Sequence, residues 1–127
     1  MPEYEEVEYT LEYSDHALER MEESEVTQGD VQLVLESCNP RICPEGYEFH
    51  VKTYEDRIRL RAIICAHYGK FDPVIFDIVQ PVYVVTNKEL TVIITAYRES
   101  GYSIGPNGVE LKRVPDKLPS QEIKHYA

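Results

Sequence analysis

The sequence lacks a long hydrophobic run and contains few cysteines. No stretch of about 18 consecutive apolar residues occurs, so the sequence predicts no membrane-spanning helix. The first ten residues, MPEYEEVEYT, are acidic and have no apolar core, which argues against a secretory signal peptide. Three cysteines are a small and odd number, which suits a reducing compartment better than a disulfide framework. We therefore expect a cytoplasmic protein without membrane contact.

An even distribution of charge is also absent. The formal net charge is −10. Residues 1–30 hold eleven acidic residues and one basic residue, Arg20, whereas residues 31–127 are neutral overall. A basic surface is the usual footprint of nucleic-acid binding. The net charge therefore argues against a nucleic-acid partner, and the neutral body of the chain weakens that argument.

The length and the apolar pattern predict one domain that opens with a strand and two helices. The 127 residues, of which 43% are hydrophobic, suffice for a compact domain with its own core. Alternation of apolar and polar residues predicts a half-buried strand over 7–13. Helices are expected at about 15–24 and 28–37. Thr27 is the expected cap of the second helix, with Asp30 completing an imperfect capping box.

The next part of the chain is predicted to form strands. The stretch GYEFHVKTYEDRIRLRAIICAHY, residues 46–68, indicates a β-hairpin that turns at Glu55-Asp56, with one apolar side and one basic side. Further strands are expected in the segments VIFDIV and PVYVVT, and at residues 90–97.

These expectations define a fold class and a domain boundary. The order β-α-α followed by an antiparallel sheet of four or more strands is α+β, with the helices packed on one face of the sheet. Residues 1–98 are expected to form this single domain. Residues 99–127 are rich in proline and glycine and predict an irregular or wrapping tail.

Three arginines recur at every second position of the predicted hairpin. Arg57, Arg59 and Arg61 would share one side of a strand. Lys52 and His50 would lie on the same side of the opposite strand, with Lys52 facing Arg59. Like charges directly across strands are unfavourable unless something compensates them. Two explanations stay open: pairing with nearby acidic residues, or binding of a phosphate, for which arginine is suited.

The stretch YSDHALERMEESEVTQGDVQLVL, residues 13–35, resembles domain-of-unknown-function family 4258. Members of that family open with a strand, the motif H-A-x-x-R-M and a second helix headed by D-V. They close on a strand ending near V-I-T-x-Y, and VIITAY, with Thr95 and Tyr97, is similar. The resemblance covers about residues 9–98. The matching positions of the first two motifs are His16, Ala17, Arg20, Met21, Asp30 and Val31.

The resemblance implies a layout and an activity. The family is similar in layout to the RelE and BrnT ribonuclease toxins, which are small domains that cleave RNA without a metal and are silenced by an antitoxin. In RelE-like toxins the working surface is a sheet face with basic residues, often with a C-terminal aromatic residue. The resemblance thus implies a RelE-like fold, RNA as a binding partner, an antitoxin or other protein as a second partner, and no cofactor or metal.

Cleavage of RNA without a metal sets requirements that name candidate residues. A base must take the 2′-hydroxyl proton, an acid must protonate the leaving oxygen, and cations must stabilise the charged phosphorane. His16 lies where the helix dipole disfavours a charged imidazole, so it could be the base, and His50 is the alternative. Arg20 shares a helix face with His16 and could instead pair with neighbouring acids. The predicted catalytic residues are His16, Arg20, His50, Arg59, Arg61 and Tyr97, and the predicted phosphate-binding residues are Lys52, Arg57, Arg59 and Arg61.

Tyrosine dominates the aromatic residues, with ten Tyr, three Phe and no Trp. The spacing places most tyrosines on sheet faces, where packing is the expected role. Tyr83, Tyr97 and Tyr102 could stack on nucleobases, and Tyr97 could also assist proton transfer.

The cysteine and histidine spacing does not predict a metal site. Cys38-x4-Cys43 and Cys65-x-His67 supply four nitrogen or sulfur ligands, but structural zinc sites prefer tighter, repeated spacings. Cys65 lies in an apolar stretch, where a free cysteine behaves as a small hydrophobic residue. We expect no metal.

A different class of function stays open. The acidic first 30 residues could be the working surface of a non-catalytic interaction protein that binds a basic partner or mimics nucleic acid. In that case glutamates from residues 3–12 would cover the arginines of the predicted hairpin. An enzyme that is autoinhibited by either end of its own chain is a third alternative.

Overall fold

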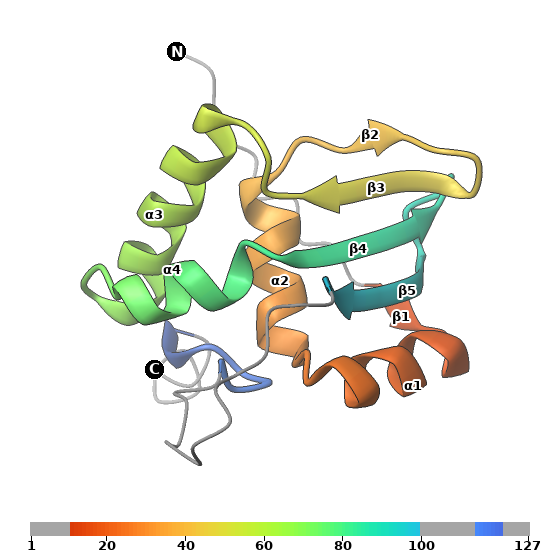
Figure 1. The fold of residues 1–127 in the computed structure, drawn as a ribbon, viewed down its shortest axis with the longest axis horizontal. Coiled ribbons are helices and arrows are strands. Elements are labelled where there is room, and N and C mark those ends of the chain that lie inside the picture. The colour runs from red at the N-terminus through yellow and green to blue at the C-terminus, as the bar shows by residue number, and fades with distance from the viewer. Residues whose placement is uncertain (1–10, 100–113, 121–127) are drawn as a thin grey trace.

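A computed structural model describes residues 11–99 and 114–120 of the chain. Within these residues the protein is an α+β structure with four helices and one five-stranded mixed sheet (Figure 1). In chain order the elements are β1 (Glu12–Tyr13), α1 (Asp15–Ser24), α2 (Gln28–Ser37), β2 (Arg41–Ile42), β3 (Gly46–His50), α3 (Tyr54–Tyr68), α4 (Pro73–Val79), β4 (Val82–Asn87) and β5 (Val92–Arg98).

The strands follow the order β1-β5-β4-β3-β2 across the sheet. β1 pairs parallel with β5, whereas the other neighbouring strands pair antiparallel. The predicted α+β class is confirmed, and β2, β3, β4 and β5 form an antiparallel sheet of four strands. The whole sheet is mixed, because the first strand, β1, lies parallel beside the last strand. The strands predicted over PVYVVT and 90–97 are confirmed as β4 and β5. Of the strand predicted over 7–13, Glu12 and Tyr13 form β1, and residues 7–10 lie outside the described residues.

Both predicted N-terminal helices are confirmed. Ser14 caps α1 by accepting a hydrogen bond from the Ala17 N–H. The Thr27 hydroxyl accepts from the Asp30 N–H, and the Asp30 carboxylate accepts from the Thr27 N–H, which completes the capping box of α2. The first turn of a helix leaves its N–H groups without partners inside the helix. These local hydrogen bonds supply the partners, which is why the helices begin where the sequence predicts.

The predicted hairpin over residues 46–68 is wrong, because most of this stretch forms α3. The sequence T-Y-E-D is a second capping box, in which Thr53 and Asp56 exchange hydrogen bonds through their backbone and side chains. The helix ends at Gly69, which adopts a left-handed conformation with φ of 78°. This conformation has little steric cost for glycine, because glycine has no Cβ atom. The two end signals define a helix of 15 residues.

The apolar pattern of α3 explains why a strand was predicted there. Alternating residues fit a strand, but the same pattern places Leu60 and Ile64 four residues apart on one face of a helix. Both side chains are fully buried. A short apolar pattern does not separate the two structures, so the capping residues decide between them.

The segment VIFDIV is also helical, and its prediction as a strand is wrong. Asp72 caps α4 by accepting hydrogen bonds from the N–H groups of Val74 and Ile75. Pro73 occupies the start of the helix, where its missing N–H and fixed φ are favourable. The β-branched residues favour a strand only weakly, and the Asp-Pro start of the helix prevails.

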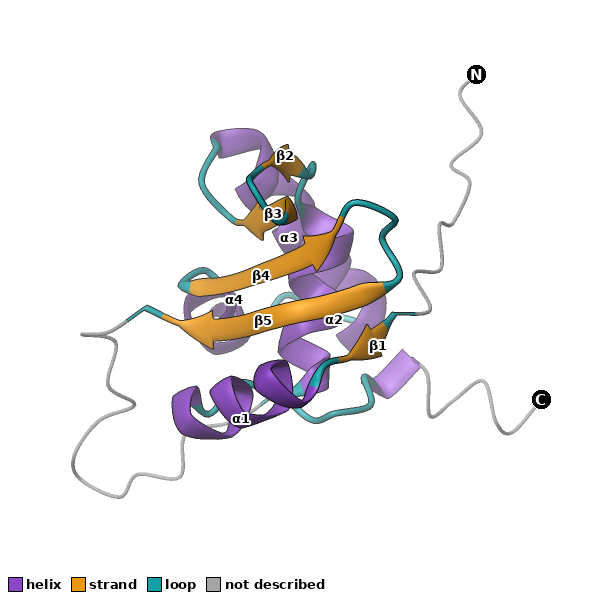
Figure 2. Cartoon of the chain, turned by 90° about the vertical axis from the view of Figure 1, so that its right-hand side faces the viewer, coloured by secondary structure: helices purple, strands orange, loops and turns teal. Residues whose placement is uncertain are grey.

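Helices and sheet form successive layers. α2 packs against β3 and β4, and α3 lies on the side of α2 that faces away from the sheet (Figure 1). α1 lies alongside β5 (Figure 2). Phe49, Val84 and Ala96 are cross-strand neighbours and fully buried, so they form the sheet side of the core. Because side chains alternate along a strand, the residues next to them point to the opposite face.

The segment 114–120 packs against the N-terminal end of α2. The Asp116 carboxylate accepts a hydrogen bond of 3.0 Å from the Gln28 N–H. Gly29 permits this close approach, because a Cβ atom at that position would lie 1.9 Å from the carbonyl oxygen of Pro115. The segment also adds two side chains to the hydrophobic core, Val114 and Leu118.

Candidate functional site

The predicted row of arginines does not form, because these residues lie on α3. Residues two apart on a helix point in directions about 200° apart, so Arg59 points away from Arg57 and Arg61. The guanidinium carbon of Arg61 lies 4.5 Å from the centroid of the Phe71 ring. Arg57 forms no ion pair with a described residue. The alternative in which glutamates from residues 3–12 cover these arginines concerns a segment of which only Leu11 and Glu12 are described.

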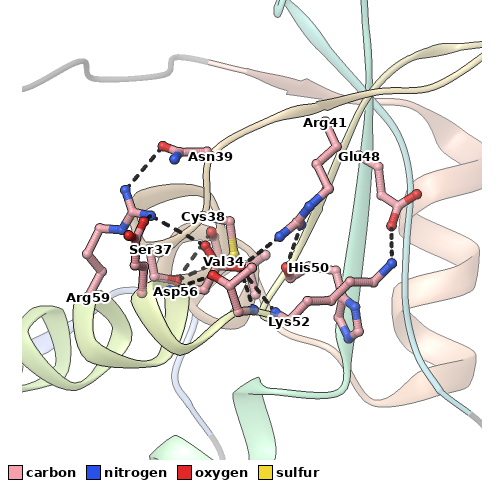
Figure 3. A network of polar contacts seen from close by, with 12 residues as sticks. Val34, Ser37, Cys38, Asn39, Arg41, Glu48, His50, Lys52, Asp56 and Arg59 are labelled. Carbon is pink, nitrogen blue, oxygen red and sulfur yellow. Dashed lines mark hydrogen bonds and ion pairs between the residues drawn. The ribbon is translucent and has the colours of Figure 1, made fainter.

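Arg59 belongs to a polar network around the buried carboxylate of Asp56 (Figure 3). Asp56 Oδ2 accepts hydrogen bonds from Arg41 Nη2 at 2.9 Å and from the N–H groups of Lys52 and Thr53 at 3.1 Å. Arg59 Nη2 lies 3.5 Å from the other oxygen, Oδ1. Burial acts to raise the pKa of Asp56, but the hydrogen bonds outweigh it and hold the pKa below its usual value. Arg59 therefore pairs with a carboxylate of its own helix.

Three rings from adjacent strands stack on the sheet face opposite the core. His50 of β3, Tyr83 of β4 and Tyr97 of β5 are direct cross-strand neighbours. The ring centroids of His50 and Tyr83 are 3.8 Å apart, and those of Tyr83 and Tyr97 are 5.3 Å apart. The interplanar angles are 16° and 10°, so the rings are stacked nearly face to face. We call these three residues the ring column.

Two cations flank the ring column. The guanidinium carbon of Arg20, on α1, lies 4.9 Å from the centroid of the Tyr97 ring. Lys52 Nζ lies 6.0 Å from the centroid of the Tyr83 ring. Both distances permit cation–π attraction. The side chains of Arg20 and Lys52 are 41% and 49% exposed, and each lies near a glutamate, Glu23 at 4.0 Å and Glu48 at 3.6 Å. Exposed pairs of this kind are weak.

The surroundings of His50 and Tyr83 favour their uncharged forms. His50 is 8% exposed, and burial lowers its pKa, so its imidazole is neutral at pH 7. Burial, with a hydrogen bond to Glu99, raises the pKa of Tyr83 to about 12, so its hydroxyl keeps its proton. A neutral imidazole can accept a proton, and Arg20 and Lys52 supply positive charge beside it. A base and nearby cations are two of the three requirements for phosphodiester chemistry without a metal.

Arg41 connects the polar network of Asp56 to the ring column. Its Nη1 donates a hydrogen bond of 2.9 Å to the carbonyl oxygen of His50, while its Nη2 donates to Asp56 (Figure 3). One guanidinium therefore joins β2, β3 and α3. It fixes the backbone of His50 at the end of the ring column.

The ring column and its two cations unite four of the residues predicted to form a site: Arg20, His50, Lys52 and Tyr97. Tyr83, which the sequence suggested only as a stacking residue, lies at their centre. The predicted residues that lie elsewhere are His16, which is exposed on α1, the α3 residues Arg57, Arg59 and Arg61, and Tyr102, which is outside the described residues.

Sequence reasoning missed the partnership between Tyr83 and Tyr97. The alternation of apolar and polar residues indicates a strand for Tyr83 and another for Tyr97, and the turn after Asn87 makes the two strands neighbours. The pairing register was the missing information. An irregularity at Val85 and Thr86 shifts the pairing of β4 with β5, so the register cannot be counted from the turn alone.

A separate polar contact ties the segment 114–120 to two helices. His67, in the last turn of α3, forms a hydrogen bond through Nδ1 with the Ser120 hydroxyl. Its Nε2 lies 2.7 Å from Oε2 of Glu36, on α2. The imidazole thus bridges three parts of the chain that are distant in sequence.

Two absences hold for residues 11–99 and 114–120. No three His, Cys, Asp or Glu side chains in these ranges come together as ligands for a metal ion. None of the helices in them combines the length and the apolar character needed to cross a bilayer.

Comparison of the chain with protein-family models, curated proteins and solved structures gave no match. Its function is therefore argued from the residues and the geometry above.

Proposed function

We propose that the protein is an RNA-binding domain of RelE-like layout, which binds single-stranded RNA across the sheet face that carries the ring column. The proposal rests on the stack of His50, Tyr83 and Tyr97, with Arg20 beside the Tyr97 ring and Lys52 beside the Tyr83 ring. The RelE-like layout places helices on the other face of the sheet. The packing of α2 against β3 and β4 supports this layout for α2, which lies behind the sheet in Figure 2, whereas α1 lies alongside β5.

The chemistry of the site matches the two chemical parts of an RNA strand. Arg20 and Lys52 lie at separate positions along the ring column, where each can contact a different phosphate. The partly exposed rings of Tyr83 and Tyr97 offer their hydroxyl groups to bases and to 2′-hydroxyl groups. Two phosphate contacts are few, so the affinity is modest. The logarithm of the binding constant should fall with the logarithm of salt concentration with a slope of about −1.4.

Cleavage of the bound RNA is a second candidate function, favoured by the neutral state of His50. His50 would remove the proton of a 2′-hydroxyl, and the 2′-oxygen would form a bond to phosphorus. The bond from phosphorus to the 5′-oxygen would break, leaving a 2′,3′-cyclic phosphate. The Tyr97 hydroxyl would protonate the leaving oxygen, and Lys52 and Arg20 would stabilise the charged phosphorane.

Fluorescence anisotropy with a labelled single-stranded RNA of mixed sequence, in EDTA, tests the binding proposal. Arg20→Ala/Lys52→Ala should weaken binding about tenfold, because both phosphate contacts are lost. Arg57→Ala/Arg61→Ala is the matched control, since it removes the same charge from α3 and should leave the affinity nearly unchanged. Equal losses in the two double variants, or no binding by the wild type at low salt, would reject the proposal.

The cleavage candidate has its own readout. In EDTA, the wild type should yield fragments that end in a 2′,3′-cyclic phosphate, and His50→Gln should yield none. Tyr97→Phe keeps the stack but removes one hydroxyl, so it should reduce cleavage and spare binding. If the wild type binds RNA but leaves it intact, cleavage is rejected and binding stands alone.

A further inference from the structure

α3 uses one face for the core and leaves another in solvent. Asp56, Leu60 and Ile64 are its buried residues, and the helix packs against α2. On the outer face, Tyr54 is 76% exposed and Ile58 is 51% exposed. α3 lies at the periphery of the molecule, with α2 between it and the sheet (Figure 1). Two large apolar side chains thus remain outside the core on one helix.

The exposed side chains of α3 follow the helical repeat. Tyr54, Ile58, Ala62 and Cys65 are four, four and three positions apart, so they share one face. All four residues are exposed. At 1.5 Å per residue this stripe is about 16 Å long, or three turns. Ala62 and Cys65 are small, so a second helix can approach the stripe closely.

Positive charge lies along one side of this stripe. Arg57 and Arg61 are four residues apart, and like charges at that spacing destabilise a helix slightly. Arg61 lies over the ring of Phe71, and Arg57 forms no ion pair with a described residue. On the other side, the carboxylate of Glu55 lies 3.9 Å from Arg59, which offsets its charge. The face is therefore apolar and basic in a chain of net charge −10.

We propose that this outer face of α3 is a docking surface for an acidic amphipathic helix of another protein. The apolar side of that helix would cover Tyr54 and Ile58, and its carboxylates would pair with Arg57 and Arg61. RNA fits less well, because the apolar stripe offers nothing to phosphates. A second copy of this chain in the antiparallel orientation would bring the arginine side of one α3 against that of the other. The surface is separate from the ring column, so the proposal does not rest on RNA binding.

A displayed library of helical peptides tests this proposal. The probe is a set of peptides with a fixed leucine and alanine stripe and random flanking positions, selected on the immobilised full chain. Asp and Glu should be enriched at the flanks. Ile58→Glu should weaken the enriched peptide at least about tenfold. Selection on Arg57→Glu/Arg61→Glu should instead enrich Lys and Arg at the flanks. Leu18→Glu, at a leucine that is 45% exposed on α1, is the matched control and should leave the affinity unchanged.

Other results would overturn the proposal. These are flanks without an acidic bias, binding that survives Ile58→Glu, or no enrichment at all. A dimer in sedimentation that Ile58→Glu abolishes would assign the surface to a second copy. Loss of RNA binding in Arg57→Glu/Arg61→Glu would assign it to RNA. Circular dichroism verifies the fold of each variant, and Ile58→Ser serves as a milder variant with the same expected direction.

Discussion

The capping boxes of α2 and α3 are built alike, yet their buried aspartates shift their pKa values in opposite directions. Each box pairs a threonine with an aspartate three residues later, Thr27 with Asp30 and Thr53 with Asp56. Both aspartates are 1% exposed. Burial raises the pKa of Asp30 to about 6. The pKa of Asp56 lies below its usual value, although burial acts on it as well.

The hydrogen bonds received from outside the box explain the difference. Asp56 accepts a hydrogen bond of 2.9 Å from Arg41, in addition to bonds from two backbone N–H groups. Asp30 accepts bonds from Thr27 alone, and Oδ1 has no hydrogen-bond partner among the described residues. Its cationic neighbour, Arg98, is 3.6 Å away and donates instead to backbone carbonyl oxygens. The same local motif therefore stabilises an ionised carboxylate at Asp56 and favours a protonated carboxyl group at Asp30.

The largest expected effect comes from removing the charge of Asp56. Asp56→Asn should lower the free energy of unfolding by about 3 kcal/mol, because the hydrogen bonds to this carboxylate lose their charged acceptor. Arg41, whose side chain is 33% exposed, would lose its partner but remain in contact with solvent. Urea unfolding at pH 7 measures this. Glu55→Gln, one residue earlier and 83% exposed at its side chain, is the control and should change stability little. A loss below about 1 kcal/mol in Asp56→Asn would show that the network contributes no more than a surface pair.

The second effect is a pH dependence of opposite sign for the two aspartates. The folded pKa of Asp30 is about 6, above its ordinary value of 3.8, so the folded state binds more protons between these values. Its stabilising contribution is therefore fully present below about pH 4 and is lost as the pH rises through 6. A shift of about 2 units corresponds to about 3 kcal/mol. Asp56 has a lowered pKa, so its contribution is present at neutral pH and is lost on acidification.

Unfolding free energies from pH 2 to 7, for the wild type and for each Asp→Asn variant, measure these contributions. The advantage of the wild type over Asp56→Asn should grow as the pH rises toward about 4 and then stay level. The advantage over Asp30→Asn should shrink as the pH rises from about 4 through about 6. Parallel profiles for the two variants would contradict the comparison.

A smaller loss is expected for Asp30→Asn at pH 7. The amide oxygen of asparagine can still accept from the Thr27 N–H, and the cost of burying a carboxylate disappears. Arg98 loses a charged neighbour but keeps three carbonyl acceptors. The free energy of unfolding should fall by about 2 kcal/mol or less, measured as for Asp56→Asn. A larger loss than that of Asp56→Asn would reverse the ranking of the two sites.

The smallest effects should come from the caps themselves. Thr27→Ala and Thr53→Ala should each lower the free energy of unfolding by about 1 kcal/mol. Each change removes the acceptor of one N–H group and leaves the aspartate in place. Thermal unfolding should rank the two variants as equal within error. A large difference would mean that the threonines, rather than the partners of the aspartates, separate the two boxes.

The same contrast shows how far sequence reasoning reached. T-x-x-D was recognised at Thr27, because an apolar helical pattern follows it, and α2 was predicted correctly. The same motif at Thr53 was overlooked, because alternating residues after it suited a strand. The arginines were consequently assigned to a sheet face, although they lie on α3. Arg20, His50, Lys52 and Tyr97 are candidates from the sequence alone, and the structure shows that they lie close together.

The sequence by itself determined the local features: the positions of α1, α2, β4 and β5, the cap of α2, and the uneven distribution of charge. These depend on residues a few positions apart, whose interactions form within one turn or one strand. Tertiary structure alone decided the parallel pairing of β1, the approach of Pro115 to Gly29 and the stack of His50, Tyr83 and Tyr97. Each of these joins residues far apart in the chain, so it exists only after the strands have paired in one register and the helices have packed.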